Sequence, residues 1–451
     1  MPTVRLTYEE GTIRVEGVET AGETLASVDG IEYDSRTECY RAPAFRYVDI
    51  REILVGAEAT IVDEGLDVSA LSLESSYRLR EYQQDALEAW EGANSCGVLE
   101  LPTGSGKTVI GLGAIEACDT PTLVVVPTID LLTQWQHELE SEFAVPIGRL
   151  GGGKQRVEDI TVATYDSAHL RADELGDRFG LVIFDEVHHL GGKSYRDIAR
   201  LFVAPARLGL TATFERPDGE HTIIEEVLGP LVYRATVDEL SGEHLAPYDI
   251  KRIEVSLTPE ERDMYERHQT VFTEYLASSN ITLRSGSDYQ ELVKRSGTDP
   301  RAREALLAKQ QAREVMMNAE RKVKRLADIL DRHTDDRVII FTAHTDLVYQ
   351  LSERFLIPAI THETTAGERR DILKRFREGE YTRVVTANVL DEGVDVPDAN
   401  VAVVLSGSGS EREFTQRLGR ILRPNADGER ALLYELVTEE TAEEQVARRR
   451  R

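Results

Sequence analysis

The sequence predicts an α/β protein with two tandem parallel-sheet domains, and three observations point to this fold class. The chain has 451 residues, which is more than one ordinary hydrophobic core supports. Two long regions contain short, near-continuous apolar runs followed directly by polar residues, as expected for strands buried on both faces of a parallel sheet. The stretch LPTGSGKT, a candidate phosphate-binding loop, lies between one such run and a helical pattern.

Residues 1–76 predict a small, separate α+β domain. In TVRLTYEEGTIRVEG, Val4, Leu6 and Tyr8 fall on one face of an expected strand, and a turn is expected at Gly11. The stretch IEYDSRTECYRAP predicts a second hairpin, with an Asp-Ser-Arg-Thr turn.

The first parallel-sheet domain is expected over residues 77–250 and the second over residues 331–451. The first contains the runs TLVVVPT, ITVATY, LVIFDE and RLGLTAT, and the second contains RVIIFTAH, TRVVTANV, NVAVVLSG and ALLYELV. In open α/β sheets, ligands bind beyond the carboxyl ends of the strands, so the polar residues after each run are site candidates. A helical insertion is expected over residues 251–330. There, apolar residues recur at steps of three and four, at Val315, Ala319, Val323, Leu326 and Leu330.

The composition predicts a cytoplasmic protein. No apolar run reaches the length of about 18 residues that a membrane-spanning helix needs. The N-terminus lacks the basic-then-apolar layout of a secretory signal. Cys39, Cys96 and Cys118 are scattered, so they indicate neither a disulfide framework nor a metal cluster.

The charge balance is strongly acidic, with 81 Asp and Glu against 53 Lys and Arg, of which nine are Lys. An acidic surface that is poor in lysine stays hydrated in molar salt, where repulsion between its charges is screened. The composition therefore favours a halophilic source such as a haloarchaeon, although an acidic mesophilic protein encoded by GC-rich DNA also fits it. The net charge of −28 argues against nucleic-acid binding unless the charge is unevenly distributed.

LPTGSGKT predicts a Walker phosphate loop, in which backbone N–H groups hold phosphate oxygens at the start of a helix. Gly104 and Gly106 let the phosphates approach closely, Lys107 reaches the β and γ phosphates, and the Thr108 hydroxyl ligates Mg²⁺. Leu101 stands where the consensus has its first glycine, so the loop departs from the consensus at that position.

LVIFDEVHH predicts the second half of a nucleotide site. Its apolar run brings Asp185 to the carboxyl end of a strand, where the carboxylate would hold Mg²⁺ through water. Glu186 would orient and deprotonate the attacking water. Acid pairs at strand ends are common on protein surfaces, so this assignment depends on the presence of Lys107 in the same chain.

QRLGRILRP, in the second domain, predicts a cationic helix face. The spacing of its polar side chains lets them line one face of a helix: Gln416, Arg417, Arg420 and Arg423. An arginine supplied to the transferring phosphate is worth about 10³ to 10⁵ in rate. Because this arginine would come from a different domain than Lys107, hydrolysis would depend on closure of the two domains, as a motor requires. A solvated arginine face is the alternative interpretation.

The ordered set of motifs resembles that of superfamily 2 helicases, which have two RecA-like domains. YRLREYQ resembles the adenine-reading Q motif, LPTGSGKT motif I, VVPTIDLLTQW motif Ia, TVATY motif Ic, DEVHH motif II and GLTATF motif III. In the second domain, IIFTAH resembles motif IV, VVTANVLDEGVDVP motif V and QRLGRILR motif VI. The matches run in order from Leu79 to Arg423.

Within this superfamily the chain is similar to the XPB branch, the duplex-DNA translocases of excision repair and transcription initiation. Motif II has Val-His, motif III has Thr-Ala-Thr and motif VI begins with Gln-Arg, where RNA-unwinding DEAD-box enzymes have Ala-Asp, Ser-Ala-Thr and His-Arg. DSRTECYRAPAFRY resembles the segment before the motor in archaeal XPB proteins, whose N-terminal domain is held to sense distorted DNA. The helical insertion resembles the family's thumb. FERPDGEH resembles the family's Arg-Glu-Asp element, except that Pro217 replaces the glutamate, a departure that bears on unwinding and not on ATP hydrolysis.

The resemblance implies an ATP- and Mg²⁺-dependent DNA helicase or translocase that tracks 3′ to 5′. It further implies a monomeric motor with a repair role and a small nuclease as partner. The catalytic residues would be Lys107, Glu186, His188, Gln416, Arg420 and Arg423. The ATP-binding residues would be Arg80, Gln83, Thr103, Gly104, Ser105, Gly106, Lys107, Thr108, Gly393 and Asp395. The Mg²⁺ ligands would be Thr108 and Asp185, and the DNA contacts would be Thr128, Thr164, Arg216, Asp218 and Thr386. Gln83 would bind the adenine edge, and His188 would couple Glu186 to the opposite domain.

The expected thumb is the least acidic part of the chain. It has 13 basic and 12 acidic residues between positions 260 and 330, and 8 basic and 4 acidic residues from 301 to 330. This distribution favours DNA contact over a helical hairpin that is balanced by internal ion pairs. In molar salt, counterion release adds little affinity, so the grip on DNA is expected to come from hydroxyl and backbone N–H groups in motifs Ia, Ic and V.

Two other functions stay open at this point. One is an ATP-gated wedge that binds DNA with little translocation, which Pro217 favours, and the other is the motor subunit of a restriction-type complex. Trp90 and Trp135 are expected to be core residues and not platforms for base stacking.

Overall fold

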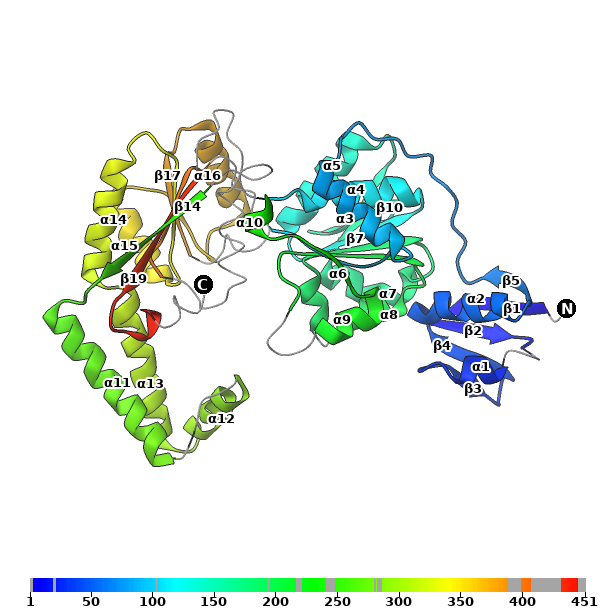
Figure 1. The fold of residues 1–451 in the computed structure, drawn as a ribbon, viewed down its shortest axis with the longest axis horizontal. Helices are drawn as coiled ribbons and strands as arrows, with labels where there is room; N and C mark the ends of the chain where they lie inside the picture. The colour runs from blue at the N-terminus through cyan, green and yellow to red at the C-terminus, as the bar shows by residue number, and fades with distance from the viewer. Residues whose placement is uncertain are drawn as a thin grey trace. The chain divides into compact units, whose positions relative to one another are not determined.

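A computed structural model of the chain confirms the α/β fold with two mainly parallel sheets. It describes residues 3–18, 22–102, 104–192, 195–215, 221–240, 248–279, 281, 286–387, 399–406 and 431–444. The described residues fall into two compact units, one up to residue 240 and the other from residue 248 on. Figure 1 traces both units in chain order. Among the described helices, each is too short or too polar to cross a membrane.

The N-terminal domain has a five-stranded sheet in the order β3-β4-β2-β1-β5. Its strands are β1 (Thr3–Glu9), β2 (Thr12–Glu16), β3 (Glu32–Asp34), β4 (Cys39–Pro43) and β5 (Thr60–Glu64), and its helices are α1 (Gly22–Ala26), the 3-10 helix Ala44–Arg46 and α2 (Tyr47–Gly56). Val4 and Leu6 are buried in its core and Tyr8 packs against that core. Gly11 has a φ of +85° in the turn between β1 and β2, which explains the glycine. Both expected hairpins are confirmed.

The first parallel sheet has eight strands in the order β13-β6-β12-β11-β7-β10-β8-β9. They are β6 (Cys96–Glu100), β7 (Thr122–Val126), β8 (Ile147–Gly151), β9 (Lys154–Arg156), β10 (Ile160–Thr164), β11 (Leu181–Asp185), β12 (Ala206–Thr211) and β13 (Leu231–Arg234). The four strands expected from apolar runs are β7, β10, β11 and β12, and every residue in them is buried. These four predictions are confirmed.

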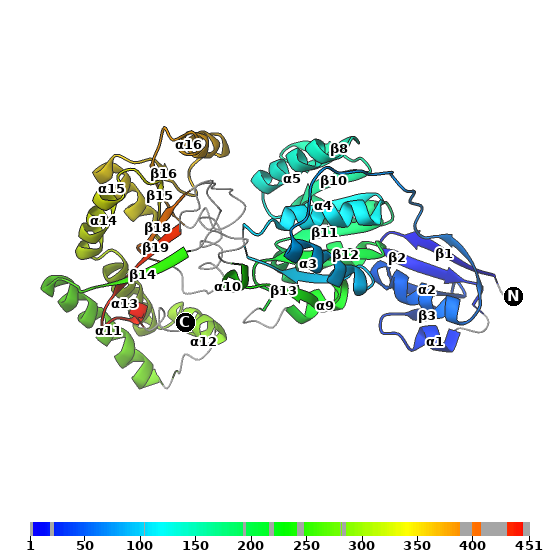
Figure 2. The same cartoon turned by 45° about the horizontal axis from the view of Figure 1, so that its top comes forward.

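Helices cover both faces of this sheet. Figures 1 and 2 show α4 (Lys107–Cys118) and α5 (Ile129–Glu142) on one face, and α8 (Arg196–Leu201) and α9 (His221–Leu228) on the other. The remaining helices of the unit are α3 (Glu81–Gly92), α6 (Tyr165–Leu170), α7 (Ala172–Leu175), the 3-10 helix Val187–Gly191 and α10 (Val237–Leu240).

The N-terminal domain contacts the first parallel-sheet domain through Tyr8. Its hydroxyl donates to the carbonyl oxygens of Asp173, at 2.9 Å, and Leu201, at 3.1 Å. Burial raises the pKa of Tyr8 to about 12. Val203 of the parallel-sheet domain belongs to the hydrophobic core of the N-terminal domain. The two domains therefore share part of one core.

The segment that joins these two domains follows the surface of α4. The backbone N–H of Leu73 donates to Asp119 Oδ1 at 2.9 Å, and that of Ser75 donates to Glu116 Oε1 at 3.1 Å. Carboxylates thus satisfy backbone donors of a segment that has no helix or strand of its own.

The second unit has a parallel sheet of six strands in the order β14-β19-β18-β15-β17-β16. They are β14 (Tyr248–Val255), β15 (Val338–Phe341), β16 (Ala359–Ile360), β17 (Arg383–Thr386), β18 (Val401–Val404) and β19 (Ala431–Thr438). The four expected strands of this domain are β15, β17, β18 and β19, and all four are confirmed. The expected boundary at residue 250 falls inside β14, which pairs with β19 at the edge of this sheet. Its alternating polar and apolar residues suit a half-exposed edge strand and differ from the continuous apolar runs.

The helical insertion consists of α11 (Pro259–Ser279), α12 (Gly286–Ser296), α13 (Pro300–Met317) and α14 (Glu320–Arg332). Figure 1 shows α11 and α13 side by side, with α12 near their far end. The expected apolar stripe crosses a helix boundary, because Ala319 is the residue that begins α14 as its N-cap. Two further helices are α15 (Thr345–Phe355), which packs on the second sheet, and α16 (Ala366–Glu378).

Candidate nucleotide site

The phosphate loop connects β6 to α4 and requires glycine at two places. Gly104 and Gly106 have φ values of +84° and +79°, in the left-handed region that favours glycine. A Cβ on Gly106 would lie 2.5 Å from Gln83 Nε2, so a side chain there would displace the Gln83 amide. Gly106 is also the N-cap of α4, a helix of 12 residues, and the first N–H groups of this helix are available to an anion.

Lys107 is the first residue of α4 and is 9% exposed. Its ammonium donates to the carbonyl oxygen of Leu101 at 3.2 Å, which keeps the side chain folded over the loop. Ser105 is fully buried, and its hydroxyl donates to the Pro102 carbonyl oxygen at 2.7 Å. Thr108 follows Lys107 in the first turn of α4. Hydrogen bonds therefore fix the described residues of the loop, and Lys107 lies at the N-terminus of α4.

The Q segment, residues 77–83, forms hydrogen bonds with the phosphate loop. Gln83 Oε1 accepts from the Arg80 backbone N–H at 2.9 Å, and Gln83 Nε2 donates to the Ser105 carbonyl oxygen at 2.9 Å. The Tyr82 hydroxyl donates to the same carbonyl. Gln83 is 4% exposed. Its amide thus already joins the start of α3 to the phosphate loop, a structural role that the sequence did not indicate, and the adenine contact stays a prediction.

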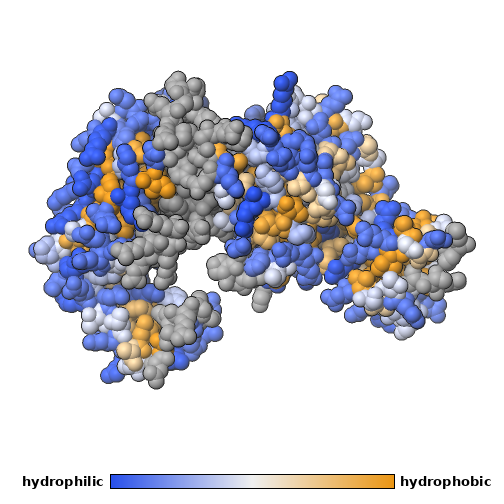
Figure 3. Space-filling view, viewed as in Figure 1, coloured by the Kyte–Doolittle hydropathy of each residue, from blue (hydrophilic) through white to orange (hydrophobic). Residues whose placement is uncertain are grey.

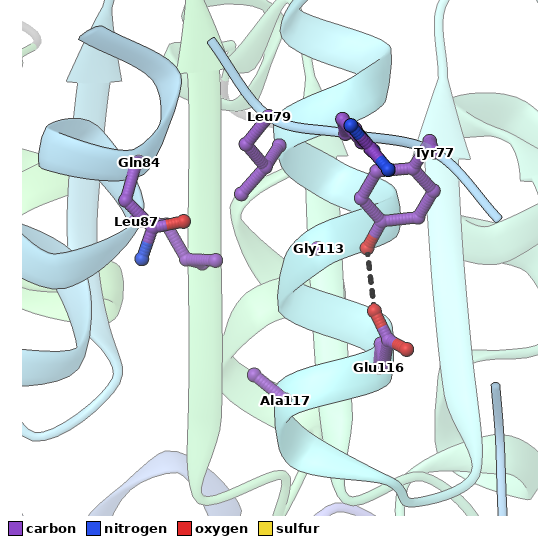
Figure 4. Close-up of a pocket in the computed structure, with 8 residues that line it drawn as sticks. Tyr77, Leu79, Gln84, Leu87, Gly113, Glu116 and Ala117 are labelled. Carbon is purple, nitrogen blue, oxygen red and sulfur yellow. Dashed lines mark hydrogen bonds between the residues drawn. The ribbon is translucent and has the colours of Figure 1, made fainter. Parts of the chain in front are cut away.

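A pocket of about 500 Å³ lies beside the Q segment, between α3, α4 and residues 77–79 (Figure 4). Figure 4 shows the Tyr77 side chain beside α4 with its hydroxyl towards Glu116, to which it donates at 3.0 Å. None of the residues that line this pocket belongs to the phosphate loop. The pocket therefore does not coincide with the triphosphate site that the sequence predicts at the start of α4.

Asp185 lies at the end of β11, and both of its carboxylate oxygens accept hydrogen bonds. Oδ2 accepts from Trp135 Nε1 at 2.8 Å, and Oδ1 accepts from the Glu186 backbone N–H at 3.0 Å. Burial, and then the charge of Glu186, raise the pKa of Asp185 to about 6, while Trp135 and Lys107 oppose this rise. This environment favours the binding of a cation by the Asp185 carboxylate, because a nearby positive charge offsets the cost of desolvating the anion.

Glu186 combines an unusual backbone conformation with a buried carboxylate oxygen that accepts no hydrogen bond within the described part of the chain. It has φ 50° and ψ 54°, a left-handed conformation that is rare for glutamate and that occurs often at functional sites. The residue is 8% exposed, and its Oε2 accepts no hydrogen bond from the described residues. His188 Nδ1 lies 3.4 Å from Oε2 and pairs with it as a cation when the imidazole is protonated. A buried carboxylate oxygen of this kind is suited to accept a proton or to orient water.

His188, in motif II, lies beside the end of β12, where motif III begins. Its Nδ1 is 3.5 Å from the Thr211 hydroxyl, which in turn donates to the Thr213 carbonyl oxygen at 2.9 Å. The histidine thus connects Glu186 to the end of β12 within the first unit. Its expected coupling to the opposite domain stays a prediction.

The residues present fit Mg²⁺ as a P-loop protein holds it. Carboxylate and hydroxyl oxygens are the ligands that Mg²⁺ prefers, and such sites use few protein ligands because water and phosphate supply the others. Asp185 provides a buried carboxylate and Thr108 a hydroxyl at the loop. Over the residues that the structure describes, no group of three or more His, Cys, Asp or Glu side chains could hold a metal by itself.

Two of the predicted DNA contacts, Thr128 and Thr164, lie at the same edge of the first sheet. Thr128 and Thr164 are the N-caps of α5 and α6, at the carboxyl ends of the neighbouring strands β7 and β10. Their hydroxyls accept from the backbone N–H of Leu131 and Ser167. Helix starts at this edge also present backbone N–H groups, which can bind DNA phosphates.

Thr386 does not fit its predicted role. It is fully buried at the end of β17, and its hydroxyl donates to the Ala387 carbonyl oxygen at 2.6 Å. A direct contact of this hydroxyl with DNA is therefore wrong for this conformation, because the strand end lies inside the core of the second unit. The remaining predicted site residues lie outside the described residues: Thr103, Arg216, Asp218, Gly393, Asp395, Gln416, Arg417, Arg420 and Arg423, together with Pro217.

Trp135 is the site residue that sequence reasoning missed. It is fully buried, as expected for a core residue, but its indole N–H reaches Asp185. No local pattern indicates this contact, because the two residues lie 50 positions apart.

Three sequence families match this chain. "Xeroderma pigmentosum group B helicase damage recognition domain" matches residues 6–64, "Type III restriction enzyme, res subunit" matches residues 76–216, and "Helicase conserved C-terminal domain" matches residues 321–425. The matches follow one another in the order of the N-terminal domain and the two parallel-sheet domains.

Two of the relatives that match over most of this chain are a translocase and a helicase. The "DNA 3'-5' translocase XPB2" of Sulfurisphaera tokodaii is 43% identical over 427 residues, which cover 94% of this chain and 97% of the relative. The "DNA 3'-5' helicase XPB" of Mycobacterium tuberculosis is 30% identical over 392 residues, which cover 84% of this chain and 64% of the relative. Among solved structures, the Pyrococcus furiosus Hef helicase domain matches with a TM-score of 0.54 and 19% identity, covering 82% of this chain and 98% of that domain. This last match shows a shared fold.

Proposed function

This chain belongs to the XPB family of DNA helicases and translocases, and on that basis we propose that it is an ATP-driven motor that moves 3′ to 5′ on DNA. Its role would be in DNA repair of the excision type and in opening DNA for transcription. Its substrate would be duplex, forked or damaged DNA, and its partner a small nuclease.

The observation that carries the proposal is the geometry of Glu186. A buried carboxylate oxygen without a hydrogen-bond donor, on a strained backbone next to Asp185, is what activation of a water molecule needs. Glu186 would orient the water that attacks the γ-phosphate and would take its proton. The N–H groups at the start of α4 and the Lys107 ammonium would hold the phosphates in line for this attack.

Mg²⁺, when bound, would neutralise charge on the β and γ phosphates, and Asp185 and Thr108 would hold it. Arg420 and Arg423 would stabilise the negative charge that develops on the transferring phosphate, and Gln416 would assist them. They belong to the second parallel-sheet domain. Hydrolysis would therefore depend on how the two motor domains close around ATP, and reopening would move the DNA.

The acidic, lysine-poor composition supports adaptation to high salt, and a haloarchaeal source is part of this proposal. Figure 3 shows hydrophilic residues over much of the surface in that view. The grip on DNA would then depend on Thr128, Thr164 and the helix starts that they cap, with the thumb as the least acidic contact surface. Threonine-to-alanine changes should weaken DNA binding at molar KCl. If only changes of thumb Lys and Arg residues weaken it there, this part of the proposal is wrong.

The central test compares ATP hydrolysis by the full chain with single-stranded DNA, duplex DNA and RNA as stimulants, at low and at molar KCl. We expect DNA to stimulate hydrolysis and RNA to have little effect. Glu186→Gln should lower kcat by about 10² to 10⁴ while ATP binding persists, because it removes the proton acceptor. Glu140→Gln, at an exposed carboxylate on α5, is the matched control. Full activity of Glu186→Gln, or equal stimulation by RNA, would contradict the proposal.

Translocation is tested separately with a DNA triplex. A motor that moves along the duplex strips the third strand, whereas a wedge that only opens DNA leaves it in place. Displacement that needs ATP and is lost in Glu186→Gln supports a translocase. Hydrolysis without displacement supports the wedge.

A further inference from the structure

We propose that Trp135 is a positioning residue of the hydrolysis site, which fixes the Asp185 carboxylate and links it to helix α5. This inference rests on the proposed function, because it assigns to Asp185 the role of holding Mg²⁺. Trp135 would not touch ATP, the metal or DNA.

The first support is the hydrogen bond itself. The indole N–H of Trp135 donates to Asp185 Oδ2 at 2.8 Å, and both side chains are buried, with exposures of 0% and 5%. A bond from a neutral donor to a carboxylate in a dry environment is stronger than a neutral pair. The Glu186 backbone N–H donates to the other oxygen, Oδ1, so hydrogen bonds hold both oxygens of the Asp185 carboxylate. Partners of this kind orient metal ligands, and their loss typically costs about 10- to 100-fold in metal affinity or activity.

The second support is that Gly111, which has no side chain, leaves space for the Trp135 indole. Trp135 packs on Gly111 of α4, where a Cβ would lie 2.4 Å from the ring atom Cη2. Gly111 lies one turn after Lys107 on the helix that begins at the phosphate loop. The indole therefore contacts α4 and the end of β11 at the same time, and it is carried by α5. A phenylalanine at this position would keep most of the packing but would lose the donor.

The link to DNA follows from the position of Trp135 on α5. Thr128, the N-cap of α5 and a proposed DNA contact, precedes Trp135 by about two helical turns. If α5 shifts when DNA binds, the Trp135 indole moves with it, and its hydrogen bond then moves the Asp185 carboxylate. We therefore expect Trp135 to contribute to the stimulation of hydrolysis by DNA, and not only to stability.

The chain supplies a matched control in its other tryptophan. Trp90, on α3, is also fully buried, and its indole N–H donates at 2.9 Å, but to the Arg207 backbone carbonyl. Trp135→Phe and Trp90→Phe thus remove the same donor from the same degree of burial, and they should lower the melting temperature to a similar extent. Only Trp135→Phe should raise the Mg²⁺ concentration for half-maximal hydrolysis, by about 10- to 100-fold, and reduce the stimulation by DNA.

Fluorescence gives a readout that needs no turnover. In the Trp90→Phe variant, Trp135 is the remaining indole, and its emission should change when Mg²⁺ and a non-hydrolysable ATP analogue bind, and again when duplex DNA is added. The Trp135→Phe variant, which retains Trp90, should show neither change. If Trp135→Phe fails to fold, the Trp90→Phe variant still decides the question, because residue 135 is native in it.

Two results would overturn the inference. One is a Mg²⁺ dependence of Trp135→Phe that equals that of Trp90→Phe, and the other is a Trp135 emission that Mg²⁺ and nucleotide leave unchanged. Either would make Trp135 a packing residue. A failure of the proposed function is distinguishable, because the wild-type chain would then show no DNA-stimulated hydrolysis at all.

Discussion

Replacing Lys322 by methionine should cost the second unit about 3 to 5 kcal/mol of unfolding free energy, because it breaks a buried ion pair. Lys322, on α14, is 1% exposed. Its ammonium donates to Glu443 Oε2 and to the Leu405 carbonyl oxygen, both at 2.7 Å. Burial lowers the pKa of Lys322 from its ordinary value, and the charge of Glu443 opposes this change.

The expected magnitude follows from what methionine leaves behind. Methionine is unbranched and of similar length to lysine, so it leaves little empty space. The cost therefore comes from Glu443, whose side chain is 12% exposed. In the Lys322→Met variant, Glu443 Oε2 would still accept from the Thr438 backbone N–H at 2.9 Å, but the carboxylate would have lost the Lys322 ammonium. Replacing both members of the pair by methionine should recover much of the loss, because no buried charge is then left without its partner.

Hydrogen exchange of the full chain, read by mass spectrometry, measures this effect locally without assuming that the whole chain unfolds in one step. Protection of the amides of α14 should fall by roughly 10²- to 10⁴-fold in Lys322→Met. Lys324→Met is the control on the same helix. Lys324 pairs with Glu320 at 2.8 Å, but the two side chains are 63% and 57% exposed. Exposed pairs of this kind contribute about 0 to 1 kcal/mol.

The reasoning would be refuted if both single variants changed the protection of α14 equally. It would also be refuted if the double methionine variant lost as much protection as Lys322→Met. In either case the ammonium would contribute no more than an exposed lysine does, and burial of the pair would not be the source of the stability.

Two further predictions concern packing and pH. Gly111→Ala should displace the Trp135 ring and raise the Mg²⁺ requirement of hydrolysis in a Mg²⁺ titration, whereas Gly113→Ala, whose Cβ would meet the Leu87 side chain at 3.1 Å, should leave it near the wild-type value. An equal effect of the two changes would contradict the packing argument. The pKa of Tyr8, which burial raises to about 12, lies above the value of 10.0 for an unperturbed tyrosine, so the contact of Tyr8 should be intact below pH 10 and should be lost as the pH rises towards 12. The difference in tyrosinate absorbance between the wild type and Tyr8→Phe should titrate near pH 12, and titration near pH 10 would refute the assignment.

Local patterns in the sequence determined most of the fold. The eight expected strands of the two parallel sheets are confirmed, because a strand buried on both faces must be apolar at nearly every position. The phosphate loop and Asp185 were predictable for a similar reason. Each depends on a short stretch in which residue type and chain geometry are linked, such as the two glycines that adopt positive φ.

Elements with mixed composition were harder to predict. In β14, polar and apolar residues alternate. The expected boundary at residue 250 divided this strand between the first parallel-sheet domain and the helical insertion, although it pairs along its full length with β19. Thr386 was expected to contact DNA because of its motif, yet the packing of the second unit buries it. In both cases the neighbours of the segment, and not its own residues, decide its environment.

The sequence by itself determined which residues could bind phosphate and a divalent cation, and at which edge of the sheet they meet. Only the tertiary structure decided which side chains hold them in place. Gln83 and Ser105 are 22 positions apart, Trp135 and Asp185 are 50 apart, and Lys322 and Glu443 are 121 apart. Helical and strand periodicities act over a few residues, so they carry no information about such pairs. These contacts form only when the packing of whole helices against a sheet brings distant polar groups into a space without water, where each must find a partner.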